Sequence, residues 1–539
     1  MPTASAHEPG RVWDVLIVGA GMGGGFTARA LAEAGYDVLL VERGNKERGN
    51  KNRGTEGASG SDRDAALAEC KWPGPSACEV DGAVSRHYGI FGAGVGGGTN
   101  LYAAALERFE RHDLESTPQL PHPTGGWPIR YDELAPFYQQ AERMLHVAGT
   151  RDPLNPDAMD HLREPPALGP VDTDIMQSFA ASGMHPYRLH VGIRYVPGCD
   201  ECLSKLCMKN CRTDAHSVVA EGAAQPTLWE RTEAVRLEAT SDSISAVTLR
   251  REGVETTVRA RVVVLAAGAV HTPKLLLQSR SEHWPDGVAN RNGMVGRNLM
   301  FHAGLRLIVW PRRQHPSTGP RKSLCFRDLY SYNGERLGVL QSSGFEARYG
   351  DLLMHLYDKF DRGPFRWLRI ARPFLRIPAK LTAAARGPGT IFSSIVEDLP
   401  YADNRVELDD NEEDGVRMKY NIRQELRDRV QRLHTLLRKR LDKRRTLVLA
   451  PDVVLNLSHA CGTCTMGVDP ATSVVDRNCR AHGIANLFIV DASFMPTSAA
   501  INPSLTIAAN ALRVAEAIKR VLAESKSSQR QNTGCLERG

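Results

Sequence analysis

The chain has 539 residues, 42% of them hydrophobic, so it is long enough to form two domains with sizeable cores. Its formal net charge of +6 is modest for this length and favours neither nucleic acid nor an anionic membrane surface as a partner. Because the sequence contains no run of about 18 apolar residues and no apolar stretch close to its N-terminus, we expect a cytoplasmic protein with neither a transmembrane helix nor a secretory signal.

The first forty residues predict a strand, a glycine-rich turn, a helix and a second strand. A near-continuous apolar run over residues 12–18 is typical of a strand buried on both faces. The glycine-rich turn 19–25 follows it, then an alanine-rich helix over 26–34 and a second apolar strand over 36–41. This unit has the size and order of a βαβ crossover, which predicts a nucleotide-binding α/β domain.

The glycines of this turn, and the acid that ends the second strand, suit a dinucleotide. Gly19 allows the tight turn, Gly21 lets the backbone approach a pyrophosphate, and Gly24 lets the helix pack closely on the strand. The N-terminus of the helix offers N–H groups and a partial positive charge to the phosphates. Glu42 is placed to accept hydrogen bonds from a ribose hydroxyl group. The alternative is a plain tight turn; the complete unit favours a dinucleotide but does not separate FAD from NAD.

Three further segments predict other parts of a cofactor cleft. The glycine-rich stretch 91–100 requires a close backbone approach or positive φ angles. The β-branched run 261–265 leads into small residues, and the apolar run 487–490 ends at Asp491. Strands that end in small or acidic residues suit the carboxyl edge of a parallel sheet, where ligands bind.

A C-terminal helix is expected to begin at Pro503, which is acceptable as a first helical residue. Asn502 before it suits an N-cap. An apolar stripe at helical spacing continues to Ile518 and predicts a buried face. If the N-terminus of this helix faces a flavin, its partial positive charge favours negative charge on the reduced ring.

Together these segments resemble the glucose–methanol–choline (GMC) oxidoreductases, a family of FAD enzymes. The resemblance spans nearly the whole chain. The matching segments are 19–42, 94–99, 126–131, 268–279, 295–299 and 459–515.

The resemblance implies bound FAD and assigns His459 as a catalytic acid–base group with Asn502 as its partner, similar to the His/Asn pair of cholesterol oxidases. An alcohol hydroxyl is a very weak acid, and a positioned base typically contributes about 10²–10⁴ in rate. The alternatives are a structural histidine bonded to backbone and an asparagine that only caps a helix. The residues expected to contact FAD are Gly19, Gly21, Gly24, Glu42, Gly94, Gly97, Gly98, Tyr102, Val235, Ala267, Gly268, Asp491, Ala492 and Pro503.

We therefore expect an α/β fold in which a Rossmann-like FAD-binding domain is interleaved with an α+β substrate-binding domain built on an antiparallel sheet. The expected FAD-binding domain comprises residues 1–110, 215–310 and 455–524, the substrate-binding domain comprises 111–214 and 311–454, and a disordered tail follows over 525–539.

A cluster of cysteines lies in the loop 199–211. Cys199, Cys202, Cys207 and Cys211 fall within 13 residues, and such density can ligate an iron–sulfur cluster or zinc. The alternative is a compact loop with buried thiols or one or two disulfides. The odd total of 11 cysteines argues against a full disulfide framework.

The segment between residues 311 and 455 lacks dinucleotide patterns. Alternating residues at 406–408 and 416–420 predict a hairpin. An apolar stripe over 426–441 predicts an amphipathic helix with a basic outer face. The segment 365–385 interleaves basic with large apolar residues, which favours a lid or a surface helix over membrane contact.

The sequence thus predicts an FAD-dependent oxidoreductase that oxidises a CH–OH group of a small-molecule alcohol, a sugar or aminoglycoside-type hydroxyl among the candidates, by hydride transfer to the flavin with His459 as base. Molecular oxygen or another acceptor takes the electrons, and no nucleic acid takes part. Two alternatives remain open: a non-redox lyase on the same fold, and a dehydrogenase that relays electrons through a cysteine-ligated iron–sulfur cluster.

Overall fold

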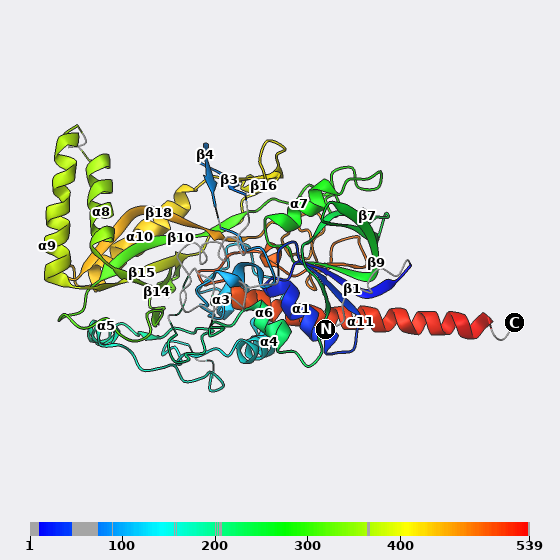
Figure 1. The fold of residues 1–539 in the computed structure, drawn as a ribbon, viewed down its shortest axis with the longest axis horizontal. Helices are drawn as coiled ribbons and strands as arrows, with labels where there is room; N and C mark the ends of the chain where they lie inside the picture. Colours follow the sequence, from blue (N-terminus) through cyan, green and yellow to red (C-terminus); the bar gives the residue numbers. More distant parts are fainter. Residues whose placement is uncertain are drawn as a thin grey trace.

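The computed structural model describes residues 10–45, 74–88, 90–363 and 367–536, apart from residues 156, 158, 200, 202, 204–206 and 208. Two sheets of different kinds lie next to each other along the long axis of the molecule (Figure 1). The fold class predicted from the sequence, α/β with an antiparallel second sheet, is confirmed.

The first sheet is built on parallel strands. β1 pairs in parallel with β2 and β9, and β9 pairs in parallel with β19. All four residues of β2 are buried, as expected of a strand covered on both faces. The helix α1 (Met22–Ala32) connects β1 to β2, so the predicted strand–turn–helix–strand unit is present. The strand order is β6-β2-β1-β9-β8-β7, with β19 also on β9; the bounds are β1 Val12–Val18, β2 Val38–Val41, β6 Thr227–Trp229, β7 Thr232–Ala239, β8 Ile244–Arg251, β9 Val254–Leu265 and β19 Leu487–Ile489.

The second sheet is antiparallel. One face packs on the helices α5 (Pro170–Ala181) and α10 (Gln424–Arg440). The apolar stripe of α10 is buried, as the sequence predicted. Along β10, Leu305 and Leu307 point into this core, so the alternate residues face the other way. The strand order is β18-β10-β15-β14-β11-β5; the bounds are β5 Tyr187–Arg188, β10 Met300–Val309, β11 Leu324–Phe326, β14 Gly338–Ala347, β15 Gly389–Val396 and β18 Thr446–Cys461.

The division of the chain between the sheets differs from the sequence prediction at β10 and at the end of β18, whose residues 455–461 were also assigned to the FAD-binding part. Residues up to 310 were assigned to the FAD-binding part, but β10 belongs to the antiparallel sheet, where it pairs with β15 and β18. The reason is long-range: the partners of β10 lie about 90 and 150 residues further along the chain, beyond what local patterning shows. The domain boundaries themselves stay a prediction.

The remaining strands form two small sheets. β16 and β17 make the predicted hairpin, and β17 also pairs in parallel with β3. The bounds are β3 Ser76–Val80, β4 Ala83–His87, β12 Ser331–Tyr332, β13 Glu335–Arg336, β16 Arg405–Leu408 and β17 Val416–Tyr420. The other helices are η1 Gly97–Asn100, α3 Arg111–Leu114, α4 Tyr131–Met144, α6 Ala215–Ala220, α7 His271–Gln278, α8 Tyr349–Arg362, η2 Arg369–Leu375, α9 Arg376–Arg386, η3 Ala492–Phe494 and α11 Ser504–Leu536.

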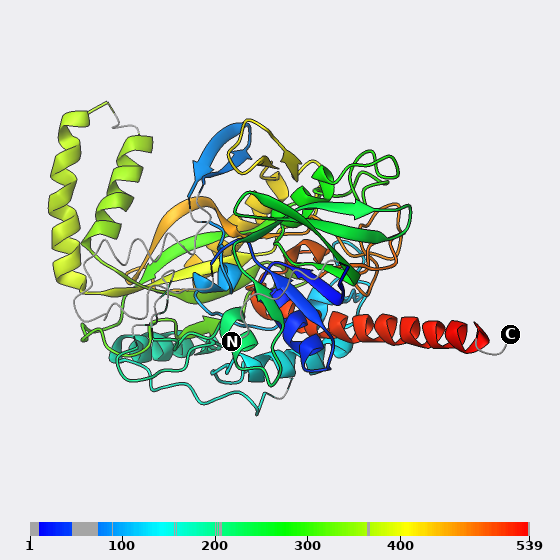
Figure 2. The ribbon, with the colours of Figure 1, turned by 45° about the vertical axis from the view of Figure 1, so that its right-hand side comes forward.

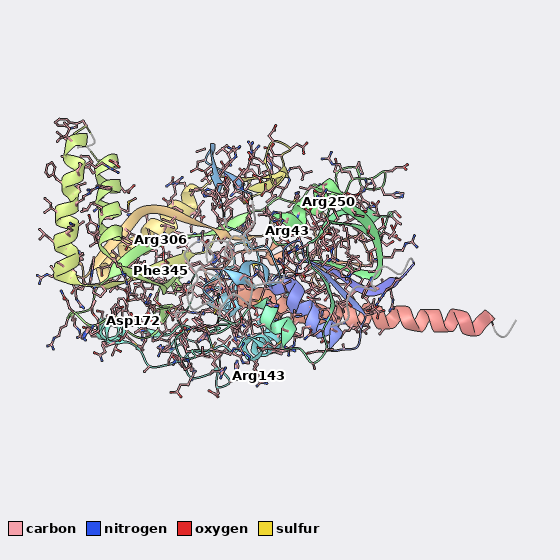
Figure 3. All side chains as sticks on the ribbon, in the orientation of Figure 1. Arg43, Arg143, Asp172, Arg250, Arg306 and Phe345 are labelled. Atoms are coloured by element: carbon pink, nitrogen blue, oxygen red, sulfur yellow. The ribbon has the colours of Figure 1, made fainter. Side chains whose placement is uncertain are left out.

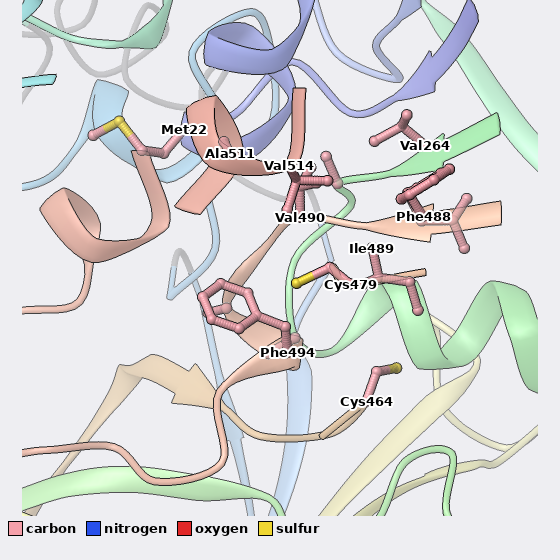
Figure 4. Close-up of a cluster of buried hydrophobic side chains, with 14 of the residues drawn as sticks. Met22, Val264, Cys464, Cys479, Phe488, Ile489, Val490, Phe494, Ala511 and Val514 are labelled. Carbon is pink, nitrogen blue, oxygen red and sulfur yellow. The ribbon is translucent and has the colours of Figure 1, made fainter. Parts of the chain in front are cut away.

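A single core fixes the start of α11 and the segment that carries His459. Figure 4 shows Val514 of α11 beside Phe488 of β19 and Val490, which follows that strand, with Cys464 and Phe494 below them. Cys464 and Phe494 are fully buried. Because Cys464 follows His459 by five residues, packing in this core constrains the position of the histidine.

Two helical segments project from opposite ends of the molecule. The C-terminal part of α11 extends past the parallel sheet, and the pair α8–α9 stands beyond the antiparallel sheet (Figures 1 and 2). The sequence predicted a disordered tail over 525–539, but the helix continues to Leu536, since no proline interrupts a segment rich in residues that tolerate helix.

Within the described residues, no helix combines the length and apolarity needed to span a bilayer.

Candidate active site

One cavity of about 720 Å³ lies where the two sheets meet. Its walls include the carboxyl ends of β1, β9 and β19, the N-terminus of α11 and the polar face of the antiparallel sheet. The predicted cofactor contacts that line it are Gly19, Gly21, Glu42, Gly97, Gly98, Tyr102, Ala267, Gly268, Asp491, Ala492 and Pro503. Both predicted catalytic residues, His459 and Asn502, line the same cavity.

Two glycine-rich loops meet at one end of the cavity. Gly19 has φ +99°, and a Cβ there would lie 2.4 Å from the carbonyl oxygen of Ala266. Gly97 has φ +53°, and its Cβ would lie 2.9 Å from the Cα of Gly21. Only glycine fits these contacts without displacing backbone. Gly21 is also the N-cap of α1 and has no side chain to cover the helix N-terminus, which leaves backbone N–H groups suited to a pyrophosphate.

The carboxylate of Glu42 joins three loops at this end. It accepts hydrogen bonds from the backbone N–H groups of Ala20 (3.0 Å), Gly44 (2.9 Å) and Gly94 (3.1 Å). A carboxylate has about four acceptor positions. One position therefore remains for a ligand hydroxyl group, and the cavity borders this residue.

Asp491 connects the ends of β9 and β19. One carboxylate oxygen accepts from the backbone N–H of Gly268 (2.9 Å) and the hydroxyl of Thr272 (2.5 Å). The other accepts from the backbone N–H and the hydroxyl of Ser493. Burial raises the pKa of Asp491 above its usual value, while these hydrogen bonds oppose the shift. The carboxylate thus holds together two strand ends that border the cofactor cleft.

Three predicted cofactor contacts lie behind the cavity wall. A Cβ on Gly24 would lie 1.9 Å from the carbonyl oxygen of Gly19, so Gly24 serves the packing of α1 on the turn. Gly94 donates to Glu42 as described. The carbonyl of Val235 accepts from the side-chain amide of Gln278 (2.7 Å), and it is Gln278 that borders the cavity.

His459 forms a two-histidine chain with His302 of β10. The Nδ1 atoms of the two rings are 2.8 Å apart, and the Nε2 atom of His302 lies 3.0 Å from the carbonyl oxygen of Ser498. A carbonyl oxygen can only accept, so His302 carries its proton on Nε2 and its Nδ1 is an acceptor. His459 must then donate from Nδ1, which leaves the lone pair on its Nε2 atom free.

The surroundings keep both imidazoles neutral. Burial, followed by the charges of His302 and Lys322, holds the pKa of His459 well below its usual value. Burial lowers the pKa of His302 to about 4. At neutral pH His459 is therefore an unprotonated base whose accepting nitrogen is set by its neighbour.

A second hydrogen bond orients Asn502. Its side-chain oxygen accepts from the side-chain amide of Gln341 on β14, at 3.0 Å. The NH₂ group of Asn502 is then available to donate towards the cavity. The side-chain oxygen of Gln341 is buried and, among the described residues, has no hydrogen-bond partner.

Sequence reasoning missed His302, Gln341 and Lys322, all of which line the cavity. His302 follows the matched segment 295–299 by three residues, so it could have been found from that resemblance. Gln341 and Lys322 lie in the antiparallel sheet and its approach, and no local motif marks either residue.

The cysteine-rich loop gathers three thiols. The sulfur of Cys211 lies 3.2 Å from that of Cys199 and 3.3 Å from that of Cys207, while Cys202 lies outside the described residues. These separations are shorter than the roughly 3.8 Å expected between thiolates around a tetrahedral metal at about 2.3 Å, and longer than a disulfide bond at about 2.05 Å. Among the residues that the structure describes, no group of three or more potential ligands could hold a metal ion, so the iron–sulfur interpretation has no support there.

A glycine cradle for a dinucleotide, joined to a neutral histidine and an oriented amide, defines a dinucleotide-dependent oxidoreductase. Comparison with protein-family models gives the particular family. Residues 14–195 match the FAD dependent oxidoreductase family, and residues 400–511 match the GMC oxidoreductase family. The chain belongs to the GMC oxidoreductases and is an FAD-dependent oxidoreductase, as the resemblance in its sequence predicted.

Known proteins resemble the chain over nearly its whole length. The 6'''-hydroxyparomomycin C oxidase of Streptomyces lividus is 31% identical, covering 98% of this chain and 96% of the relative. The 2-methyl-1,2-propanediol dehydrogenase of Mycolicibacterium austroafricanum is 27% identical, covering 94% and 95%. The crystal structure of a pyridoxine 4-oxidase from Mesorbium loti superposes with a TM-score of 0.63 at 19% identity, covering 94% of this chain and 98% of that one, which shows a shared fold.

Proposed function

We propose that the protein oxidises a CH–OH group of a small-molecule alcohol to a carbonyl, with His459 as the base. The observation that carries the proposal is the hydrogen-bond chain from Ser498 through His302 to His459, which leaves an accepting nitrogen on a neutral imidazole in the cavity. A structural histidine would instead be expected to use both nitrogens on protein partners.

The nucleotide end of the cavity fits FAD. Because Gly21 and Gly97 have no side chains, their backbones approach closely and leave space for the nucleotide beside them. The N-terminus of α1 would hold the pyrophosphate. Glu42 would accept from a ribose hydroxyl with its remaining acceptor position. When bound, FAD supplies an acceptor for the hydride that leaves the alcohol carbon.

The protein side chains handle the proton and the orientation of the substrate. Asn502 donates a hydrogen bond to the substrate oxygen and so positions it, and His459 removes the hydroxyl proton through Nε2. Once protonated, His459 carries a positive charge close to Lys322. The same surroundings that lower the pKa of His459 then favour release of this proton. His302 keeps the accepting nitrogen directed at the substrate throughout.

The named relatives support an alcohol substrate without fixing its identity. One is named as the oxidase of a hydroxylated aminoglycoside and another as the dehydrogenase of a diol, so sugar-type hydroxyls and simple diols are both candidates. Molecular oxygen and other electron acceptors are both consistent with such relatives. The cytoplasmic location expected from the sequence stays a prediction.

The test is anaerobic reduction of the bound flavin. Purified protein is analysed for its flavin, then mixed without oxygen with sugars, aminoglycosides and diols while flavin absorbance is followed. Bleaching by an alcohol, with the matching carbonyl as product, is the expected result. A product that forms while the flavin stays oxidised would indicate the lyase alternative and would overturn the proposal.

A further inference from the structure

Lys322 is a cation at the substrate end of the cavity. It lies two residues before the start of β11, lines the cavity and is only 5% exposed. Its ammonium group is close enough to lower the pKa of His459. Among the described residues, no carboxylate lies within ion-pair distance of its ammonium group. The charge of the nearby Glu201 favours the protonated lysine, but the oxygens of Glu201 accept from the hydroxyl of Tyr195 and from the backbone N–H groups of Arg321 and Lys322.

Arg306 adds a second cation to the same wall. It follows His302 by four residues on the cavity face of β10, which places their Cα atoms about 13 Å apart. It pairs across the sheet with Ser393, which pairs with Gln341, so Arg306 lies about 10 Å from the residue that bonds Asn502. Figure 3 shows Arg306 well away from Arg43, which lies at the nucleotide end.

Acidic residues border only the other end of the cavity. The carboxylates among its described lining residues are Glu42, Glu233 and Asp491, and all three lie beside the glycine cradle or the strand ends. The face formed by β10, β14 and β15 offers serines, the amide of Gln341 and the cation Arg306 instead, and Lys322 adds the second cation from the segment before β11. Burying an ammonium group without an ion-pair partner costs free energy. An anionic group on the substrate, bound in this cavity, would supply that partner.

We propose that the alcohol substrate carries an anionic group, a carboxylate, phosphate or sulfate, which Lys322 binds and Arg306 attracts at the open end. The inference rests on the proposed function, because it narrows the substrate class of that same site. It excludes substrates whose amino groups enter this end of the cavity, since an ammonium there would be repelled by both cations. Within sugar-type alcohols it selects sugar acids and sugar phosphates over amino sugars.

The experiment compares ligands that cannot be oxidised, so that binding is measured without turnover. The holoenzyme is titrated at neutral pH and constant ionic strength with cyclohexanecarboxylate and with the neutral cyclohexanecarboxamide, and the absorbance change of the bound flavin gives each Kd. We expect the carboxylate to bind about 10-fold to 100-fold more tightly, as for a charge-assisted hydrogen bond in a buried site.

Variants connect the preference to the named residues. Lys322→Met should remove most of the preference and Lys322→Arg should keep it, while Lys443→Met, an exposed lysine after α10, serves as the matched control and should bind as the original protein does. Equal binding of the two ligands, or a preference unchanged in Lys322→Met, overturns the inference.

A turnover comparison separates this inference from the proposed function. Glucuronate, glucose and glucosamine share one ring and differ in charge, and their anaerobic bleaching rates should fall in that order. If alcohols reduce the flavin without regard to charge, the anionic-substrate inference fails and the proposed function stands. If no alcohol reduces the flavin, the proposed function fails, and the inference about the substrate of that reaction fails with it.

Discussion

Replacing His302 with leucine tests the tautomer argument most sharply. The change removes the nitrogen that accepts from Nδ1 of His459, at 2.8 Å, and leaves that N–H group without this partner. Leaving such a group unsatisfied costs about 1–3 kcal/mol. The neutral ring of His459 can then move its proton to Nε2, the nitrogen that must be free to act as base.

The size of the effect follows from that cost. Since about 1.4 kcal/mol corresponds to a factor of ten, His302→Leu should slow flavin reduction by about 5-fold to 150-fold. His302→Asn offers an oxygen near the position of Nδ1 and should recover a large part of the rate. The Kd for substrate should change less than the rate, because the lost hydrogen bond connects two protein side chains.

Anaerobic stopped-flow reduction at saturating substrate is the appropriate assay. It reports the rate of the chemical step apart from substrate binding, and flavin absorbance before mixing confirms that each variant is loaded. If fully loaded His302→Leu reduces its flavin as fast as the original protein, the two-histidine chain has no part in setting the base.

Three further predictions follow from the same cavity. Gln341→Leu frees the amide of Asn502 to rotate and should lower kcat, measured by steady-state kinetics, by about 5-fold to 30-fold. Gln341→Glu should recover little of this activity, because a carboxylate cannot donate a hydrogen bond to Asn502. Gly97→Ala places a Cβ 2.9 Å from the Cα of Gly21 at a positive φ, so the purified protein should hold markedly less flavin per chain, measured from the absorbance ratio; normal loading would contradict the cradle. Because burial lowers the pKa of His459, its neutral form persists below pH 6.5, and the acid limb of kcat/KM should lie below that value; a limb at or above pH 6.5 would contradict the assignment.

The sequence predicted those parts of the fold that local patterning encodes. The strand β1, the turn at Gly19 and the helix α1 are visible because their apolar runs and glycines are contiguous. The hairpin of β16 and β17 and the buried stripe of α10 are visible for the same reason. The positions of His459 and Asn502 came from motifs that the family resemblance supplied.

The rest of the site depends on pairings between distant segments. His302 meets His459 because β10 pairs with β18, across more than 150 residues. Gln341 reaches Asn502 only after β14 joins the sheet and α11 is packed in place. Lys322 has no sequence signal at all, since a single lysine before a short strand is more often solvated.

The central claim is that His459 removes the proton of an alcohol while the flavin is reduced. The most direct measurement is the anaerobic rate of flavin reduction in His459→Gln relative to the original protein, with exposed His283→Gln as the control. A decrease of about 10²–10⁴ confined to His459→Gln is the predicted result. Reduction at an unchanged rate in a flavin-loaded His459→Gln protein would contradict the account.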